Sequence, residues 1–324
     1  MTTIRDVAKR ANVSVNTVSR VLNSRGYLSE ETIRKVHQAI DELDYHPSAI
    51  ARALVKRQTK LLGVIVPSIV NPFFATFLDS LERHAASANY RLVVCNSLQD
   101  KGKEKEYVDS LRSNNVAGIV ISTRNDHLGQ ALGGMPAVTL ERIISDDIPT
   151  ITCDNYQGGE LATEHLVGAG CRRLAIITGS LDIDLPANKR VQAFADVARR
   201  HGIEPWIYTC DEATFLASSY ADTIARIFSE HPDVDGIFAT SDVIGAQVIQ
   251  YCASRHMDVP QRVKVVGFND TMPAGLTNPP LSTIRQPIDQ MADAALSVLE
   301  AEIKGEKACG ITVLPVKLVR RGTT

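Results

Sequence analysis

The feature that most constrains this chain is an alternation of short apolar runs with helical stretches, and it occurs twice in succession. The first set is LLGVIVP, YRLVVCN, VAGIVIST and PAVTLE, and the second is RRLAIITGS, WIYTCD, DGIFATSD and VKVVGFND. Continuous apolar runs of this length are typical of buried parallel strands. Helices are expected between them, near 73–88, 103–114, 126–132, 188–201, 217–230 and 243–255. The pattern predicts an α/β fold with two doubly wound parallel sheets.

The end of the chain adds a strand-like segment, a helix and a last apolar run. A strand-like LSTIRQP is followed by a helix from about Ile288 to Ile303 and by the apolar run ITVLPVKLVRR. Two open α/β halves stacked together leave a cleft at the carboxyl ends of their strands, where ligands of this architecture bind. We therefore expect a small-molecule site in that cleft.

The first 60 residues differ from the rest of the chain in charge. They hold 11 Lys and Arg against 6 Asp and Glu, whereas the remaining residues hold 24 against 31. The formal net charge of the whole chain is −2. This asymmetry predicts a basic arm that binds nucleic acid, attached to a neutral or acidic body. No apolar run approaches the roughly 18 residues that span a bilayer, and MTTIRDVAKR has no apolar core of an export signal. We expect a cytoplasmic protein without membrane association.

Three short helices are predicted in the basic arm. Thr3 and Asp6 have capping-box spacing, so the first helix runs from Ile4 to about Lys9 or Arg10. Asn12 suits the left-handed residue of a tight turn. The second helix spans about 15–22 after the N-cap Ser14, and the third begins after Ser29. Two helices joined by a short turn, with a third that closes the core, describe a helix-turn-helix.

The outward face of the second helix has side chains suited to reading DNA. Asn16 and Arg20 can pair bidentately with adenine and guanine edges, and Val15 can touch a thymine methyl group. Other polar groups can hold phosphates and set the register: Thr3, Ser14, Thr17, Ser19, Asn23 and Tyr27. The alternative is a three-helix module for protein contacts with a solvated basic face.

The segments TIRDVAKRANVSVNTVSRVLN, LSEETIRKV and ELDYHPSAIARAL resemble the N-terminal headpiece of the lactose/galactose repressor family of bacterial transcriptional regulators. The resemblance implies that the helix beginning at Val15 enters the major groove. It also implies a homodimer bound to a pseudo-palindromic operator in double-stranded DNA, since two-fold symmetry in the protein imposes matching half-sites.

The segment 47–60 is expected to be a hinge helix and linker. Alone, two helical turns are unstable in water because nucleation costs more than they return. The resemblance implies that two such helices pair in the minor groove, with Ala51 where they meet and Leu54 wedged between base pairs. Lys56 would contact the DNA backbone. The alternative for Leu54 is an ordinary leucine of a helix core.

The body resembles periplasmic sugar-binding proteins of the ribose type in VPSIVNPFFATFLDSLERHA, VTLER, NKRVQAF, VVGFND and LSTIRQP. This implies a headpiece at 1–46 and an effector-binding and dimerisation domain at 61–324. The N-lobe would comprise about 61–156 plus 289–313, and the C-lobe about 160–286 plus 316–322. The implied effector is a sugar or a sugar phosphate, and a purine or other non-sugar effector is the alternative.

Matching positions imply an effector site, in which aromatic rings pack on a sugar face and polar groups bond its hydroxyls. The residues are Asn71, Phe73, Phe74, Glu141, Arg142, Arg190, Phe215, Ser241, Asn269 and Gln286. The alternatives are two core phenylalanines, a turn-forming Asn71 and an exposed Glu141–Arg142 ion pair. Asn269 departs from the Asp of most relatives, and an amide donates as well as accepts.

Catalytic and metal-binding motifs are missing from the sequence. There is no GxxxxGK[ST], GxSxG, HExxH or strand-linked GxGxxG, and the six cysteines never form a CxxC pair. We therefore expect no enzyme activity, no cofactor and no metal. An enzyme remains one alternative class, and a sugar receptor without DNA function is another, although a receptor of that kind would need export.

Overall fold

The computed structural model describes residues 2–22, 28–45, 59–125, 127–308 and 310–324. It divides into two compact units, Met1–Thr59 and Lys60–Thr324, here called the headpiece and the body. Within the described residues, no helix combines the length and the apolar character needed to cross a bilayer.

Three helices form the headpiece: α1 (Ile4–Ala11), α2 (Val15–Leu22) and α3 (Glu30–Glu42). The predicted caps are confirmed. Thr3 Oγ1 accepts from the Asp6 backbone N–H at 3.4 Å, while Asp6 Oδ2 accepts from the Thr3 N–H at 2.8 Å. Asn12 has φ 54°, and Ser14 Oγ accepts from the Thr17 N–H at 3.0 Å.

The headpiece core is built mainly from small side chains, which let the three helices cross closely. Its buried members are Val7, Ala8, Ala11, Val18, Val21, Val36, Ala39 and Tyr45. Such a core excludes little apolar surface from water, so hydrophobic burial stabilises this small unit only modestly.

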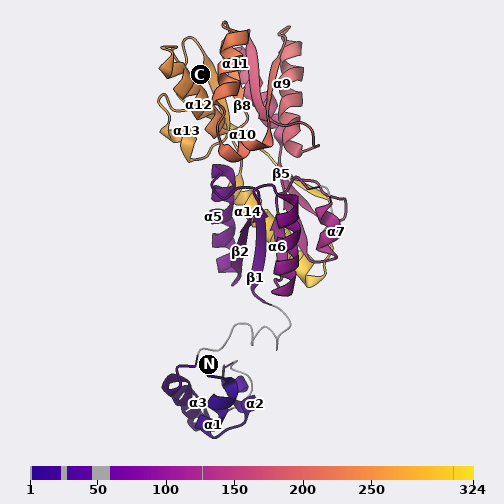
Figure 1. Ribbon diagram of the computed structural model, residues 1–324, viewed down its shortest axis with the longest axis vertical. Helices are drawn as coiled ribbons and strands as arrows, with labels where there is room; N and C mark the ends of the chain where they lie inside the picture. The colour runs from indigo at the N-terminus through magenta and orange to yellow at the C-terminus, as the bar shows by residue number, and fades with distance from the viewer. Residues whose placement is uncertain (1, 23–27, 46–58, 126, 309) are drawn as a thin grey trace. The chain divides into compact units, whose positions relative to one another are not determined.

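One lobe of the body, the N-lobe, contains a six-stranded sheet in the order β11-β5-β4-β3-β1-β2, and every neighbouring pair is parallel. Its strands are β1 (Leu61–Val66), β2 (Arg91–Asn96), β3 (Gly118–Ile121), β4 (Ala137–Leu140), β5 (Thr150–Cys153) and β11 (Ile311–Leu314). Its helices are α5 (Pro72–Ser87), α6 (Lys101–Ser113), α7 (Leu128–Leu132) and α14 (Ile288–Lys304). Helices α5 and α14 pack against each other although they are far apart in sequence (Figure 1).

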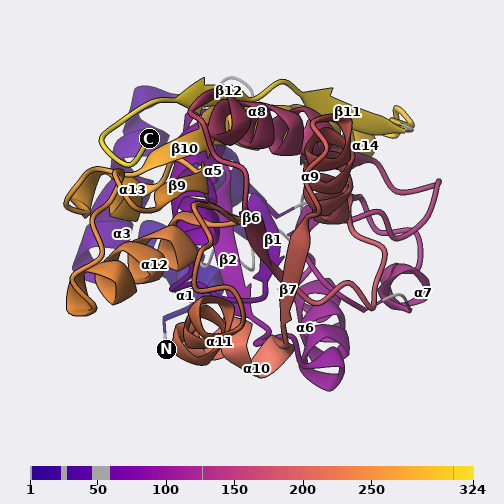
Figure 2. The ribbon, with the colours of Figure 1, turned by 90° about the horizontal axis from the view of Figure 1, so that it is seen from above.

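The other lobe, the C-lobe, repeats this plan in the strand order β12-β10-β9-β8-β6-β7, with only β12 antiparallel to its neighbour. Its strands are β6 (Leu174–Gly179), β7 (Trp206–Cys210), β8 (Gly236–Ala239), β9 (Lys264–Asn269), β10 (Ser282–Arg285) and β12 (Lys317–Val319). Its helices are α8 (Asn155–Gly168), α9 (Lys189–Arg200), α10 (Glu212–Ala217), α11 (Ala221–Glu230), α12 (Asp242–Ser254) and α13 (Met272–Leu276), with the 3-10 turn η1 (Pro186–Asn188). Figure 2 shows α8 beside α9.

The chain passes between the lobes three times: after β5, after β10, and between β11 and β12. The predicted fold class, a helical headpiece followed by two parallel-sheet lobes, is confirmed. The sequence did not predict β5, α10 or α13. These elements are short, so apolar periodicity does not reveal them.

Candidate effector cavity and nucleic-acid interface

A cavity of about 210 Å³ lies between the two lobes. It is lined by segments that follow the carboxyl ends of strands from both sheets, as expected for paired open α/β sheets. Nine of the ten predicted effector residues line it: Asn71, Phe73, Phe74, Glu141, Arg190, Phe215, Ser241, Asn269 and Gln286. The tenth, Arg142, is not among the lining residues.

Two phenylalanines from the first turn of α5 form one wall of the cavity. Asn71 is the N-cap of α5, and its Oδ1 accepts from the Phe73 N–H at 3.0 Å. It therefore begins the helix, as the turn-forming alternative expects, and it also lines the cavity. The rings of Phe73 and Phe74 meet edge to face with centroids 5.1 Å apart. Both are more than nine-tenths buried in the apolar core, yet both reach the cavity. They therefore belong to the core and to the cavity wall at once.

Glu141 is held by the protein itself, in a left-handed backbone conformation with φ 52°. Its Oε1 accepts from the Cys153 N–H at 2.7 Å and from Thr152 Oγ1 at 3.0 Å, and its Oε2 accepts from Asn155 Nδ2 at 3.0 Å. A carboxylate has about four acceptor positions, so at most about one remains for a ligand. The alternative of an exposed Glu141–Arg142 ion pair is wrong, because Arg142 is buried and the Glu141 side chain is only 10% exposed.

Arginines of the N-lobe reach across to the C-lobe. Arg142 Nη1 donates to the Asp184 carbonyl at 2.7 Å, and Arg124 Nη2 donates to the Ser180 carbonyl at 3.4 Å. Arg124 lines the cavity, whereas Arg142 lies outside its lining. These bonds join the two lobes, so their lengths depend on how close the lobes are.

Arg190 is buried and held on several sides. Its Nε donates to Asn155 Oδ1 at 2.7 Å, its Nη1 donates to the Thr240 carbonyl at 3.1 Å, and its guanidinium lies 3.6 Å above the centroid of the Phe268 ring. Its Nη2 is 3.9 Å from Glu141 Oε2, so the charges of the two lobes meet here. The guanidinium is thereby fixed in orientation at the cavity wall.

Two amide side chains line the cavity near the point where the chain crosses between the lobes after β10. Gln286 Nε2 donates to Asn269 Oδ1 at 2.7 Å, and both residues are more than nine-tenths buried. Asn269 has φ 108°, a conformation that Asn tolerates better than most residues. Gln286 Oε1 is buried and has no hydrogen-bond partner among the described residues. Ser241 caps α12, and its Oγ accepts from the Ile244 N–H at 3.3 Å.

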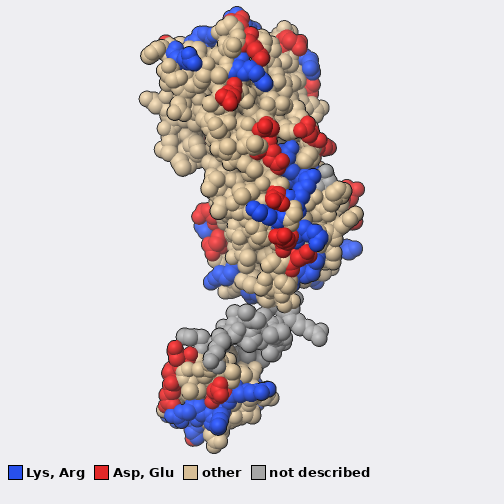
Figure 3. Space-filling view, viewed as in Figure 1, with Lys and Arg blue, Asp and Glu red and all other residues tan. Residues whose placement is uncertain are grey.

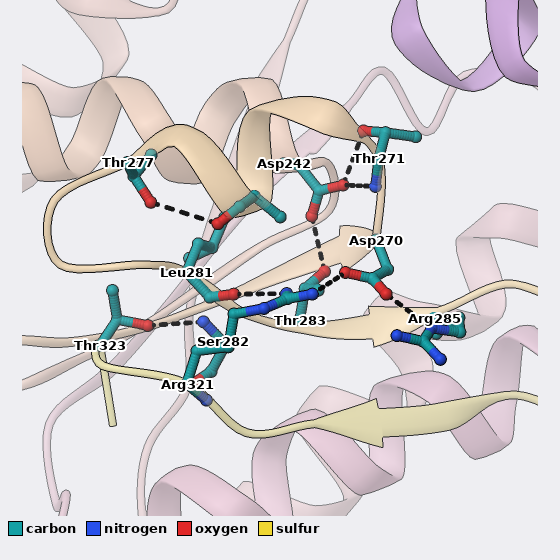
Figure 4. A network of polar contacts seen from close by, with 11 residues as sticks. Asp242, Asp270, Thr271, Thr277, Leu281, Ser282, Thr283, Arg285, Arg321 and Thr323 are labelled. Carbon is teal, nitrogen blue, oxygen red and sulfur yellow. Dashed lines mark hydrogen bonds and ion pairs between the residues drawn. The ribbon is translucent and has the colours of Figure 1, made fainter.

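Beside this wall, Asp242 connects three cavity-lining segments (Figure 4). Its Oδ2 accepts from the backbone N–H of Thr271 at 2.7 Å and from the Thr271 hydroxyl at 2.8 Å. Its Oδ1 accepts from the Thr283 hydroxyl at 2.6 Å. Burial of the fully enclosed carboxyl raises its pKa to about 6. Asp242 thus ties the start of α12 to the residues that follow β9 and to β10.

The C-lobe contains a second carboxylate link nearby. Asp270 accepts hydrogen bonds from Arg285 Nε and Arg321 Nη2, both at 2.6 Å (Figure 4). It therefore joins the end of β10 to the segment after β12. These bonds stabilise the edge of the C-lobe sheet that β12 forms.

Sequence reasoning missed several lining residues, among them Gln99, Thr123 and Arg124. Thr123 donates its hydroxyl to buried Glu104 at 2.5 Å, and burial raises the pKa of Glu104. Gln99 Oε1 is buried without a hydrogen-bond partner among the described residues. Their position after β2 and β3 was the available signal, since ligands of this architecture gather at strand carboxyl ends.

In the headpiece, α2 directs its predicted reading residues outward. Val15 is 42% exposed, Asn16 and Arg20 are exposed, and Val18 is fully buried on the opposite face. The helix has one basic residue and no acidic one. On the visible face of the headpiece, Lys and Arg side chains lie alongside Asp and Glu (Figure 3). The predicted contacts Asn23, Tyr27, Ala51, Leu54 and Lys56 lie outside the described residues.

A helix-turn-helix unit followed by a bilobal body with an interlobe cavity defines the class of ligand-responsive DNA-binding regulators. Comparison with known proteins agrees. Residues 3–48 match the lacI family of bacterial regulatory proteins, and residues 163–324 match a periplasmic binding protein-like domain. The chain belongs to the lacI family and is a DNA-binding transcriptional regulator.

Relatives extend over the whole chain. A ribose operon repressor of Halalkalibacterium halodurans is 34% identical over 100% of this chain and 97% of its own length. A sucrose operon repressor of Pediococcus pentosaceus is 34% identical over 98% of each chain. The solved structure of a Lac repressor dimer bound to operator and the anti-inducer ONPF is 26% identical, with a TM-score of 0.87, and covers 99% of this chain and 98% of that one.

Proposed function

We propose that this chain represses genes for carbohydrate uptake or catabolism, and that a sugar or sugar phosphate in the interlobe cavity releases it from its operator. The observation that carries the proposal is the convergence of nine residues from both lobes on one cavity, with aromatic rings on one wall and buried amide and guanidinium groups on the others. Apolar ring faces with polar groups at the rim suit the hydroxylated ring of a sugar. The operon repressors among its relatives are named for ribose and sucrose, which supports the same class of effector.

In this proposal the protein acts as a homodimer on a pseudo-palindromic operator. The body exposes large apolar side chains in both lobes, among them Val70 at 76%, Met272 at 69% and Leu276 at 75%. The area of the visible surface over α13 is largely free of charged side chains (Figure 3). Apolar surface of this kind is typical of subunit interfaces. Two headpieces would then read matching half-sites through Val15, Asn16 and Arg20.

The effector would act by changing the distance between the lobes. Hydrogen bonds from Arg124 and Arg142 to carbonyls of the other lobe form only when the lobes are close. Lobe movement would alter the separation of the two 47–60 segments in a dimer and so their pairing on DNA. Coupling of this kind is reciprocal: an effector that weakens operator binding is itself bound more weakly in the presence of operator.

We also propose that the cavity binds its ligand without chemical conversion. Among the carboxylates that line the cavity, Glu141 is engaged by three protein donors and Asp211 caps α10, which leaves neither well placed to take a proton from a ligand. Among the described residues, no group of three or more His, Cys, Asp or Glu could hold a metal ion.

A purine is the second candidate effector, because Phe73 and Phe74 present aromatic surface to the cavity. A planar base needs a ring face parallel to its own, whereas a sugar packs its C–H groups on a single ring face. Thermal-shift measurements with sugars, sugar phosphates and nucleobases separate the two candidates, and a shift by a nucleobase alone would exclude the sugar class.

The decisive experiment is footprinting of the full chain on the DNA upstream of its own gene and of neighbouring carbohydrate genes, with and without a carbohydrate panel. We expect protection of an inverted repeat that is lost when the effector is added. Equal binding to the inverted repeat and to random duplex at physiological ionic strength would overturn the proposal.

A further inference from the structure

The end of the N-lobe at which β1 begins is the end from which the chain leads to the headpiece. Lys60 is the first residue of the body, and β1 follows it at Leu61. Every neighbouring pair of strands in this sheet is parallel, so the amino ends of its six strands lie along one edge, here called the amino edge. On the visible face, Lys and Arg side chains lie at this end of the N-lobe (Figure 3). The amino edge is therefore the part of the body that is closest along the chain to the DNA-binding segments.

Two cationic side chains adjoin at the amino edge. Lys60 precedes β1, and Arg91 is the first residue of β2, with its backbone N–H donating to the Lys60 carbonyl at 2.8 Å. Both residues are exposed. Buried Tyr90 contacts both of them: Lys60 Nζ lies 4.1 Å from the centroid of its ring, and its carbonyl accepts from Arg91 Nη1 at 2.8 Å. One buried residue thus positions an ammonium and a guanidinium group side by side.

The protein does not neutralise these two charges. Within the part of the chain that the structure describes, neither Lys60 nor Arg91 forms an ion pair. By contrast, Arg83 on α5 is paired with Asp79 at 3.4 Å, and Arg112 on α6 with Asp109 at 3.3 Å. Neighbouring like charges repel each other, and an anion bound to both relieves the repulsion. Guanidinium and ammonium groups are the usual ligands of phosphate oxygens, so the pair has the chemistry of a phosphate contact.

The amino edge carries two further cations. Lys304 is the last residue of α14, Lys307 lies in the segment that leads into β11, and both are exposed. Glu306 lies between them and reduces their effect. The chain after residue 60, taken as a whole, holds 24 Lys and Arg against 31 Asp and Glu. A basic edge on an acidic body favours the orientation in which that edge faces a polyanion.

From these observations we infer that the body itself binds DNA, and that Lys60 and Arg91 of each subunit contact backbone phosphates of the duplex that the headpieces bind. The six residues from Val55 to Lys60 can span at most about 21 Å, which keeps the amino edge close to DNA held by the preceding segment. Duplex DNA carries a phosphate charge about every 1.7 Å along its axis, so the pair finds phosphates in any sequence. This contact is independent of the effector and adds to the base reading by α2.

The test is the salt dependence of DNA binding by the full chain. Fluorescence anisotropy across a series of salt concentrations follows binding to two short duplexes, one with the inverted repeat that footprinting protects and one of random sequence. Lys60→Gln with Arg91→Gln removes two charges from each subunit. We expect the slope of log affinity against log salt concentration to become less steep by at least about 1.8, which is one phosphate contact per subunit, on both duplexes alike. Affinity at low salt should fall at least about tenfold on each, so the preference for the inverted repeat stays unchanged.

Two further double variants are the controls. Arg199→Gln with Arg255→Gln makes the same charge change on exposed residues of the C-lobe, and Arg255 also lies over an aromatic ring, 5.6 Å from the centroid of Tyr251. This variant should keep the wild-type slope. Lys60→Arg with Arg91→Lys retains both charges and should also keep it. Thermal unfolding followed by circular dichroism establishes that each variant is folded.

The possible outcomes separate this inference from the proposed function. A wild-type slope in the folded Lys60→Gln, Arg91→Gln variant would overturn the inference. An equal change in the C-lobe control would overturn it too, because the effect would then belong to the overall charge of the protein. A loss on the inverted repeat alone would contradict a contact that is independent of sequence. If the wild type shows no preference for the inverted repeat, the proposed function fails, while the random duplex still tests the amino edge.

Discussion

The headpiece and the body place their polar side chains in opposite ways. In the headpiece, Asn16 and Arg20 are exposed on a helix whose other face packs on a core of Val and Ala. In the body, Arg190, Asn269 and Gln286 are more than nine-tenths buried, and most of their hydrogen-bonding groups are already partnered. A recognition helix on the surface binds DNA with side chains that do not stabilise the fold, whereas a buried site uses the same side chains for binding and for stability.

This difference predicts distinct responses to substitution. Removing an exposed reading group should change DNA binding and leave folding intact. Removing a buried polar group of the body should change folding and ligand binding together, because its hydrogen-bond partners are left unsatisfied in the protein interior.

The largest effect is expected for Arg20→Ala. A bidentate contact between arginine and guanine contributes about 1–3 kcal/mol of discrimination, and a dimer makes it twice, so preference for the operator over random duplex should fall at least about 30-fold. Electrophoretic mobility shifts on both duplexes measure the ratio. Arg34→Ala on exposed α3 removes the same charge and should lower affinity for both duplexes alike. Equal losses on both duplexes for Arg20→Ala would show that this residue does not read bases.

In the body, Asp242→Ala should lower the free energy of unfolding by about 3 kcal/mol, because it leaves the Thr271 N–H and two hydroxyls without their acceptor. Urea denaturation followed by circular dichroism measures the loss. Asp222→Ala, at an exposed position in the first turn of α11, is the control and should cost less than about 1 kcal/mol. A loss below 1 kcal/mol for Asp242→Ala would contradict the linking role of this carboxyl.

The same carboxyl makes the stability of the body depend on pH. Its pKa in the folded protein, about 6, lies above the ordinary aspartate value of 3.8, so the folded state binds the proton more tightly. The stabilising contribution of this group is full below about pH 4 and is lost as the pH rises through 6, a change of about 3 kcal/mol at most. Asp242→Asn cannot titrate there, so its stability should vary less between pH 4.5 and about 7. An identical pH profile for wild type and variant would contradict the raised pKa.

Local rules predicted the headpiece well, because its structure depends on neighbours in sequence. The capping box of Thr3 and Asp6, the left-handed Asn12 and the cap Ser14 all act within three residues. Most strands of the body were also predicted, since long apolar runs mark buried parallel strands directly. Nine of the ten predicted effector residues lie at one cavity, because sheets of this kind bring their strand ends together.

The contacts that decide what each group can do were not predictable in this way. Glu141 lines the cavity as predicted, but the sequence did not show that Thr152, Cys153 and Asn155 already donate hydrogen bonds to its carboxylate. Asp242 follows a capping serine and has the sequence of an ordinary first-turn acid, and only the approach of β9 and β10 buries it. Such long-range pairings depend on how strands of different segments align, which a single sequence does not state.

The smallest effect is expected for substitutions of Thr3, which should change the stability of the headpiece but not that of the body. Thr3→Ala removes the cap of α1 and should lower the stability of the headpiece by about 1 kcal/mol, while the body is unchanged. Thr3→Ser keeps the hydroxyl and should restore that stability. Thr3 is also a predicted phosphate contact. Operator affinity in Thr3→Ala should therefore fall by more than the loss of folding stability explains, and the salt dependence of binding should stay nearly constant because no charge is removed.

Calorimetry measures the first role through separate melting transitions of the headpiece and the body, and operator titrations at two salt concentrations measure the second. If the headpiece melts as in wild type but the operator is still bound more weakly, Thr3 acts on DNA alone and the cap contributes nothing to this small core.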